Sequence, residues 1–219
     1  MKKSIIFKIF CAVLCVALTC VTFSACGNTD IGIIGGEDGP EVVVTGEPME
    51  NTKVKFEMEC DGKSMGSFVI EVYPEYAPIT AANFVMLVEQ GFYDGLIFHR
   101  VVDDFMAQGG APKGESAAAI KGEFAANGVN NPLADNHERG VVSMARTNDP
   151  NSASSQFFIC YSDTYSSSLD GNYAAFGKVI EGMQVVDSFL DVPRTYNSFD
   201  SKPATPTVDI VITSATVVE

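Results

Sequence analysis

The sequence is poor in the residues that most enzymes use for covalent or metal chemistry. Its 219 residues include two histidines, six cysteines and no tryptophan. Cys11, Cys15 and Cys20 lie in the apolar N-terminal run, and the chain has no Cys-x-x-Cys pair or His/Cys spacing typical of a metal site. We therefore expect neither a metal nor a cofactor.

Positive charge is also scarce. Fourteen Lys and Arg residues face 28 Asp and Glu residues, a formal net charge of −14. Such a surface repels phosphate backbones, so we expect no nucleic-acid partner. Hydrophobic residues make up 46% of the chain, which is enough for one sizeable core at this length.

The first 25 residues have the composition of an export signal. Three lysines and no acid accompany an apolar run from Ile5 to Val21. The following Phe23-Ser24-Ala25-Cys26 resembles the lipobox of bacterial lipoproteins, in which the cysteine receives a diacylglyceryl group. We predict a signal peptide over 1–25, lipidation of Cys26, and an extracytoplasmic protein anchored to the cell membrane of a bacterium. An uncleaved membrane anchor and an ordinary signal cleaved nearby are the alternatives.

Residues 26–52 are rich in glycine, acids and proline and show no sustained helical or strand period. This composition predicts a flexible tether between the lipid and a folded domain over 53–219. The stretch IGIIGGEDGP within it is unusual for a spacer, and a short docking peptide is the alternative.

The remaining sequence predicts a mainly β domain. Residues 53–60 and 66–73 alternate in polarity around Asp61-Gly62, which is typical of a β-hairpin. Apolar spacing predicts helices from Pro78 to about Gly91 and over 183–190. Further strands are expected over 98–102, 140–144, 154–160, 173–179 and 208–218. We predict a closed antiparallel β-barrel capped by two α-helices, and a functional or mobile excursion over 111–139.

Two stretches have an unusual inventory for an enzyme site. In FHRVVDDFMAQGG (98–110), strand alternation places Phe98, Arg100 and Val102 on one side, where a guanidinium needs a partner. The other side then carries His99 and Val101. Together with SSQFFIC (154–160), this stretch supplies one cation, two amides and several apolar groups, without an obvious nucleophile.

In SSQFFIC, alternation separates Gln156 and Phe158 from Phe157 and Ile159. Phe157 and Ile159 are then expected to face the core. This leaves Phe158 for another role, although a single phenylalanine is more often part of a core.

The motifs FHRVVDDFMAQGG, GVVSMAR, SSQFFIC, LDG and FGKVIEGM, in this order, resemble the cyclophilin family of peptidyl-prolyl cis/trans isomerases. The resemblance spans about 53–219. It implies an eight-stranded antiparallel barrel closed by two helices. It also implies isomerisation of X–Pro bonds in proline-containing polypeptides, here exported chains that are unfolded or partly folded.

The resemblance assigns Arg100 as the catalytic donor to the twisting prolyl amide, against the alternative of a structural salt-bridge arginine. It implies that ten further residues bind the substrate: His99, Phe105, Met106, Gln108, Ala145, Arg146, Gln156, Phe158, Leu169 and Tyr173. Outside this set, His137 is expected to be a loop residue.

The chain departs from the family pattern at three positions. Ser168 replaces a common tryptophan, Tyr173 a histidine, and Arg146 an asparagine. The missing tryptophan predicts weak binding of cyclosporin-type inhibitors. Cys60 and Cys160 are expected to be small buried thiols, with a disulfide between them left open.

The leading hypothesis is an isomerase that assists folding near the membrane and acts as a monomer. A catalytically weak peptide-binding or adhesion module is the main alternative. A solute-binding lipoprotein fits the anchor but not a single small barrel.

Overall fold

The computed structural model describes residues 21–24, 29–36, 39–46, 49–114 and 116–219, with side chains from residue 49 onward. Cys26 and most of the predicted signal peptide lie outside the described residues. Within the described ranges, no helix has both the length and the apolar character needed to cross a bilayer.

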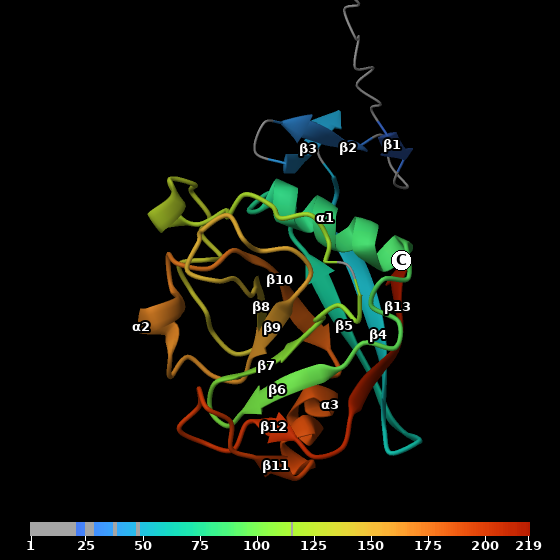
Figure 1. The fold of residues 1–219 in the computed structure, drawn as a ribbon, viewed down its shortest axis with the longest axis vertical. Coiled ribbons are helices and arrows are strands. Elements are labelled where there is room, and N and C mark those ends of the chain that lie inside the picture. Colours follow the sequence, from blue (N-terminus) through green and yellow to red (C-terminus); the bar gives the residue numbers. More distant parts are fainter. Residues whose placement is uncertain (1–20, 25–28, 37–38, 47–48, 115) are drawn as a thin grey trace, which may run out of the picture.

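Eight antiparallel strands form one sheet in the order β13–β4–β5–β10–β8–β9–β7–β6 (Figure 1). The segment that leads into β6 closes the sheet on β13, because Gly95 N–H donates to the Ile212 carbonyl at 2.7 Å, Ile212 N–H donates to the Leu96 carbonyl at 2.8 Å, and Ile97 bridges Val211. The predicted closed barrel is therefore confirmed. Its strands are β4 (Thr52–Cys60), β5 (Lys63–Val72), β6 (Phe98–Val102), β7 (Met106–Gly109), β8 (Val141–Met144), β9 (Phe157–Cys160), β10 (Ala175–Glu181) and β13 (Ile210–Val218).

The hairpin turn between β4 and β5 follows from its sequence. Asp61 and Gly62 both have positive φ, at 52° and 69°. Two such residues form the turn whose twist matches paired strands, and Asp-Gly is a preferred pair for it.

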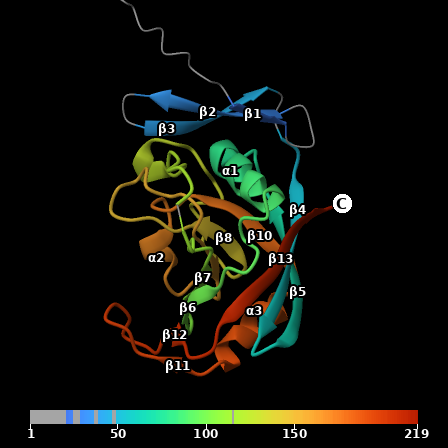
Figure 2. The same cartoon turned by 45° about the vertical axis from the view of Figure 1, so that its right-hand side comes forward.

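The two predicted helices lie at opposite ends of the barrel (Figures 1 and 2). Helix α1 (Pro78–Glu89) ends just before Gly91, whose φ is +65°. Helix α3 (Met183–Ser188) continues into a 3₁₀ turn, η2 (Phe189–Asp191), and stops before Pro193. A third, single-turn helix, α2 (Ser166–Leu169), lies between the strands predicted over 154–160 and 173–179, where the sequence predicts no helix.

Aromatic rings fill the barrel. Phe56 stacks on Phe68 with ring centroids 5.1 Å apart, and Phe84 of α1 lies 5.5 Å from Phe157 of β9. Phe84 also contacts Phe56 of β4 and Phe176 of β10, so the helix is joined to three strands and is part of the core rather than a separate lid.

Residues 26–52 differ from the expectation that they form no strand. Strand β2 (Thr29–Gly36) pairs with β3 (Gly39–Gly46), and β1 (Val21–Ser24) pairs with β2. Isoleucines in β2 and valines in β3 favour extended backbone. The glycines among them interrupt the alternation of polar and apolar residues by which a strand is recognised. This small sheet lies beside α1, outside the barrel (Figure 2). Its service as a tether stays a prediction.

The excursion over 111–139 packs on the barrel instead of forming a free loop. Ile120, Phe124 and Ala134 are buried, and it contains one 3₁₀ turn, η1 (Ala125–Asn127). Ile120 N–H also donates to the Ala153 carbonyl at 2.8 Å. Burial of these apolar side chains holds the segment on the barrel. The polar, Ala-rich composition of the segment gives no indication of that burial.

Glu123 of this excursion caps α1. Ala77, which precedes the helix, has no side chain able to cap it. The Glu123 carboxylate instead accepts the N–H groups of Ile79 and Thr80 at 3.1 and 2.8 Å, and the Thr80 hydroxyl at 2.7 Å. Burial raises the pKa of Glu123, although the bonds from Thr80 and Ile79 oppose that rise.

Both cysteines of the described domain are free thiols. Cys160 is fully buried, and burial raises its pKa to about 12, whereas Cys60 is half-buried. The expectation of small buried thiols therefore holds for Cys160 and only in part for Cys60.

We predict that Glu123→Ala destabilises the domain by about 2 kcal/mol, because it leaves two helix N–H groups and a buried hydroxyl without their acceptor. For a domain of this size, the melting temperature should fall by roughly 5 °C in a thermal unfolding scan. Glu89→Ala removes an exposed acid from the last turn of the same helix and should be nearly neutral. Equal melting temperatures for the two variants would contradict the capping role.

Candidate active site

The outer face of the barrel wall carries a second apolar cluster, separate from the main core. Phe157 and Ile159 point into the core, while Phe158 points outward, as alternation predicts. The outer cluster comprises Val102, Met106, Phe158, Cys160, Leu169 and Ala204, with Phe105, Ala145 and Tyr173 packed against it.

A small cavity of about 110 Å³ opens in this cluster. Nine of the eleven residues assigned by resemblance line it: Arg100, Phe105, Met106, Gln108, Ala145, Arg146, Phe158, Leu169 and Tyr173. The structure therefore brings together residues from across 74 positions of sequence. His99 and Gln156 lie outside the lining.

The β6 strand does not alternate as simply as predicted. Phe98 pairs with Gly109 and Arg100 with Gln108, so His99 is an extra residue in a β-bulge. Phe98 consequently lies in the main core with Val101, and the prediction that it shares a side with Arg100 was wrong. The bulge releases Arg100 to the outer face, where its side chain is 29% exposed.

Arg100 begins a chain of side-chain hydrogen bonds. Its Nη1 donates to Gln108 Oε1 at 3.2 Å, and Gln108 Nε2 donates to Gln156 Oε1 at 3.0 Å. Gln156 thus supports the site from behind the cavity. The guanidinium carbon lies 5.6 Å from the centre of the Phe105 ring, a distance typical of a cation–π contact.

A second partner of Arg100 escapes sequence reasoning. Arg100 Nε donates to Asp200 Oδ2 at 2.9 Å and Nη2 donates to Oδ1 at 2.5 Å. The Arg100 guanidinium holds the pKa of Asp200 below its usual range. The alternative of a salt-bridge arginine is therefore correct about the pairing, yet the same guanidinium also lines the cavity.

Arg146 organises a second part of the cavity lining. Its guanidinium carbon lies 4.6 Å from the Tyr173 ring centre and 5.2 Å from that of Phe124. Nε and Nη2 both donate to the Asn172 carbonyl, at 2.9 and 2.8 Å. Arg146 therefore fixes Tyr173, which in turn meets Phe158 edge-on at 5.7 Å.

His137 lies in a loop, as expected, but its polar surroundings do not reveal that its side chain is buried. It is fully buried, with Nδ1 2.9 Å from the Asp170 carboxylate and Nε2 3.2 Å from Ser143 Oγ. Its ring stacks on Phe158 at 6.2 Å. Burial lowers the His137 pKa in spite of Asp170, so a neutral ring supports the cavity floor near pH 7.

His99, the neighbour of Arg100, is half-buried and its Nδ1 has no hydrogen-bond partner. Burial, reinforced by the nearby Arg100 charge, lowers the His99 pKa. It lies beside the cavity, so its role in binding substrate stays a prediction.

The position of the absent tryptophan faces solvent. Ser168 is exposed in α2 and its hydroxyl donates to the Tyr165 carbonyl at 2.8 Å. The Tyr165 ring packs on Phe105 with centroids 4.6 Å apart, so this tyrosine supports one residue of the cavity lining. Tyr161 is instead buried and donates to the Val186 carbonyl at 3.0 Å.

The arrangement suits binding of a small apolar ring beside a fixed cation. Phe105, Met106 and Phe158 offer apolar contact, and Arg100 offers hydrogen-bond donors. Among the residues described from 49 onward, no three His, Cys, Asp or Glu side chains gather in a way that could hold a metal ion.

Comparison with known proteins agrees with this geometry. The family "Cyclophilin type peptidyl-prolyl cis-trans isomerase/CLD" matches residues 55–217. A peptidyl-prolyl cis-trans isomerase of Acinetobacter baylyi is 40% identical over 183 residues, which cover 80% of this chain and 88% of that protein. Peptidyl-prolyl cis-trans isomerase A of Dickeya dadantii is 37% identical over 71% of this chain and 82% of its own length.

A solved structure shares the fold. The crystal structure of a cyclophilin-type isomerase of Cryptosporidium parvum superposes with a TM-score of 0.64 at 26% identity, covering 78% of this chain and 99% of that one. The same protein has also been crystallised in the presence of the dipeptide Ala-Pro. With the barrel, the cavity and these similarities together, the chain belongs to the cyclophilin-type peptidyl-prolyl cis-trans isomerases.

Proposed function

We propose that this isomerase uses Arg100 as the donor to a twisting X–Pro amide and assists the folding of exported proteins at the membrane surface. The observation that carries the catalytic proposal is that Arg100 lines the same small cavity as the apolar side chains Phe105, Met106 and Phe158. The lipobox-like sequence around Cys26 carries the proposal about location.

Rotation about an X–Pro bond needs no covalent chemistry. Amide resonance sets a barrier of roughly 18–20 kcal/mol. At the top of that barrier the resonance is lost and the prolyl nitrogen regains a lone pair. A donor placed at this nitrogen binds the twisted amide more strongly than the planar one, which lowers the barrier.

The cavity residues divide the work of binding. The proline ring would pack against Phe105, Met106 and Phe158, with Leu169 and Tyr173 as the far wall. Gln108 gives one Nε2–H to Gln156, so its other amide hydrogen can donate to a substrate carbonyl. This would hold the flanking backbone while the amide turns.

The main chain beside the cavity has a defined role in this scheme. Ala145 N–H already donates to the Gln156 carbonyl at 2.9 Å. An extended substrate would therefore pair with the Ala145 carbonyl. Arg146, already committed to Asn172 and the two aromatic rings, would act as a wall instead of binding substrate through charge.

We predict that Arg100→Ala lowers the isomerisation rate by at least about a hundredfold, the loss typical of removing one preorganised donor. The rate can be measured by NMR exchange spectroscopy on a proline peptide. Arg139→Ala breaks an exposed ion pair with Asp187 and should retain the wild-type rate. A fully active, folded Arg100→Ala protein would defeat the mechanism and favour a different role for the groove.

Cyclosporin-type inhibitors should bind weakly, in the micromolar range or above. The exposed Ser168 supplies neither the apolar area nor the ring N–H of a tryptophan. Inhibition in a protease-coupled assay tests this, and Ser168→Trp is expected to tighten it. Nanomolar inhibition of the wild-type protein would show that the tryptophan is dispensable.

Mass spectrometry of the mature protein expressed in a bacterium should find a diacylglyceryl-modified Cys26 at its N-terminus. Cys26→Ser should remain unlipidated. An N-terminus at another residue, or an unmodified Cys26, would rule out the proposed anchor.

A further inference from the structure

We propose that Asp200 is a positioning residue for Arg100, carried to the active site by the segment 194–206. This inference rests on the proposed role of Arg100 in the isomerase. It assigns a function to a loop that contains none of the cyclophilin-like motifs, and to an acid that does not line the cavity.

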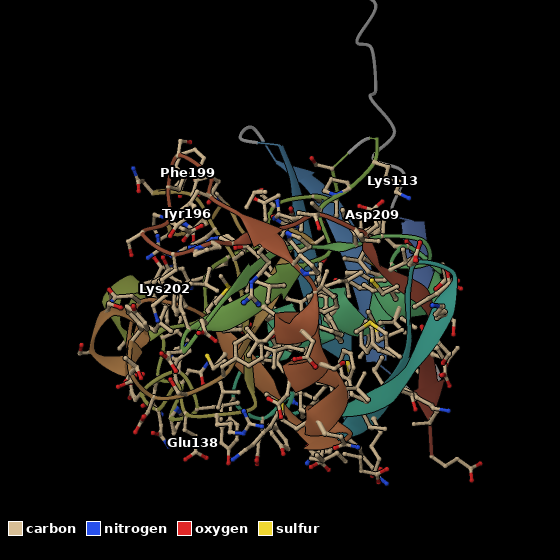
Figure 3. All side chains as sticks on the ribbon, turned by 90° about the horizontal axis from the view of Figure 1, so that it is seen from below. Lys113, Glu138, Tyr196, Phe199, Lys202 and Asp209 are labelled. Carbon is tan, nitrogen blue, oxygen red and sulfur yellow. The ribbon has the colours of Figure 1, made fainter. Side chains whose placement is uncertain are left out.

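The segment is a hairpin fastened along the barrel edge. Strands β11 (Arg194–Thr195) and β12 (Thr205–Pro206) pair at its base. Val101, which directly follows Arg100 in β6, donates its N–H to the Ala204 carbonyl at 2.8 Å. Figure 3 shows Tyr196, Phe199 and Lys202 of this segment along one edge of the molecule.

The tip of the hairpin is shaped to present a carboxylate. Asn197 Oδ1 accepts the N–H groups of Phe199 and Asp200, at 2.9 and 2.8 Å, which closes a turn. Asn197 Nδ2 donates to Asp200 Oδ2 at 2.8 Å. Lys202 connects the tip to the turn between β6 and β7 by donating to the Asp103 carbonyl at 3.0 Å. Asp200 is thus held from both sides.

The Asp200 carboxylate is nearly buried, with its side chain 7% exposed. A carboxylate in that position needs a close cation, and both of its oxygens accept from Arg100. The fork-to-fork geometry fixes the plane of the guanidinium as well as its distance, which a single contact would not do.

The contacts leave Arg100 able to act. A guanidinium has five N–H groups, and the bonds to Asp200 and Gln108 use three of them. One N–H on each terminal nitrogen therefore remains for substrate. Asp200 does not line the cavity, whereas Arg100 and Gln108 do, so the carboxylate grips the guanidinium from outside the substrate space.

Positioning has a direct kinetic consequence. A free arginine side chain samples many rotamers, and ordering it in the transition state would add to the barrier. Asp200 imposes that order before substrate arrives. Its removal should therefore lower the rate of the bound complex much more than the affinity for the peptide.

The test compares Asp200→Asn with the wild-type protein. Asparagine keeps the size of the side chain but replaces one acceptor oxygen with a donor, so the two-point bond to Arg100 cannot form. The exchange rate at saturating proline peptide should fall by about tenfold, while peptide affinity measured by NMR titration changes by less than about twofold. The Arg100 Nε–H signal should also exchange faster with water.

A double-mutant cycle separates positioning from general damage. Lysine cannot make the fork-to-fork contact, so Asp200→Asn should cost little further activity in an Arg100→Lys background. Asp209→Asn, which removes an exposed carboxylate elsewhere, is the charge-matched control and should leave the rate unchanged.

Three results would overturn the inference. These are a wild-type rate in Asp200→Asn, a faster rate that would mark Asp200 as a competitor for the guanidinium, and an equal loss in the wild-type and Arg100→Lys backgrounds. The wild-type and Arg100→Ala rates from the same assay establish the isomerase function independently of Asp200.

Discussion

Strand alternation in one wall of the barrel is the constraint on which both the fold and the site depend. Arg100, Gln108, Phe158 and Ser143 pair in turn across β6, β7, β9 and β8, so they form a single lateral row. Their sequence neighbours on the opposite face, such as Ala107 and Ile159, belong to the core. Because the core holds the strands in register, the residues of the outer row are separated by the regular distance between neighbouring strands. A catalytic group on this row is therefore held as rigidly as the strands themselves.

The row needs an irregularity before a cation can join it. Regular alternation from Phe98 would keep Arg100 on the core side, where an unpaired guanidinium is costly. The bulge at His99 moves it outward, to Gln108 on one side and Asp200 on the other. Bulges of this kind commonly re-aim a side chain beside an active site.

Much of this was predictable, and the failures have physical causes. Alternation in 154–160 correctly separated Phe158 from the core, and the motifs identified nine cavity-lining residues. Strand period alone cannot reveal a bulge, so Phe98 was misplaced. Asp200 and His137 lie in polar loops, where composition carries no information on burial. Only the tertiary fold brings Asp200 to a residue 100 positions earlier and His137 to the back of Phe158.

Arg146, which replaces the asparagine of the family pattern, is accommodated by the excursion over 111–139. Two consecutive residues of this excursion have different roles: Glu123 caps α1, and Phe124 packs on the Arg146 guanidinium. Arg146 also contacts the Tyr173 ring, and Tyr173 lines the cavity. A cation that contacts two aromatic rings stabilises both, so the charge at this position strengthens the part of the cavity lining to which Arg146 and Tyr173 belong. The Tyr173 side of the cavity thus depends on the same excursion that caps the start of α1, and changes in that helix cap should reach the cavity through Phe124.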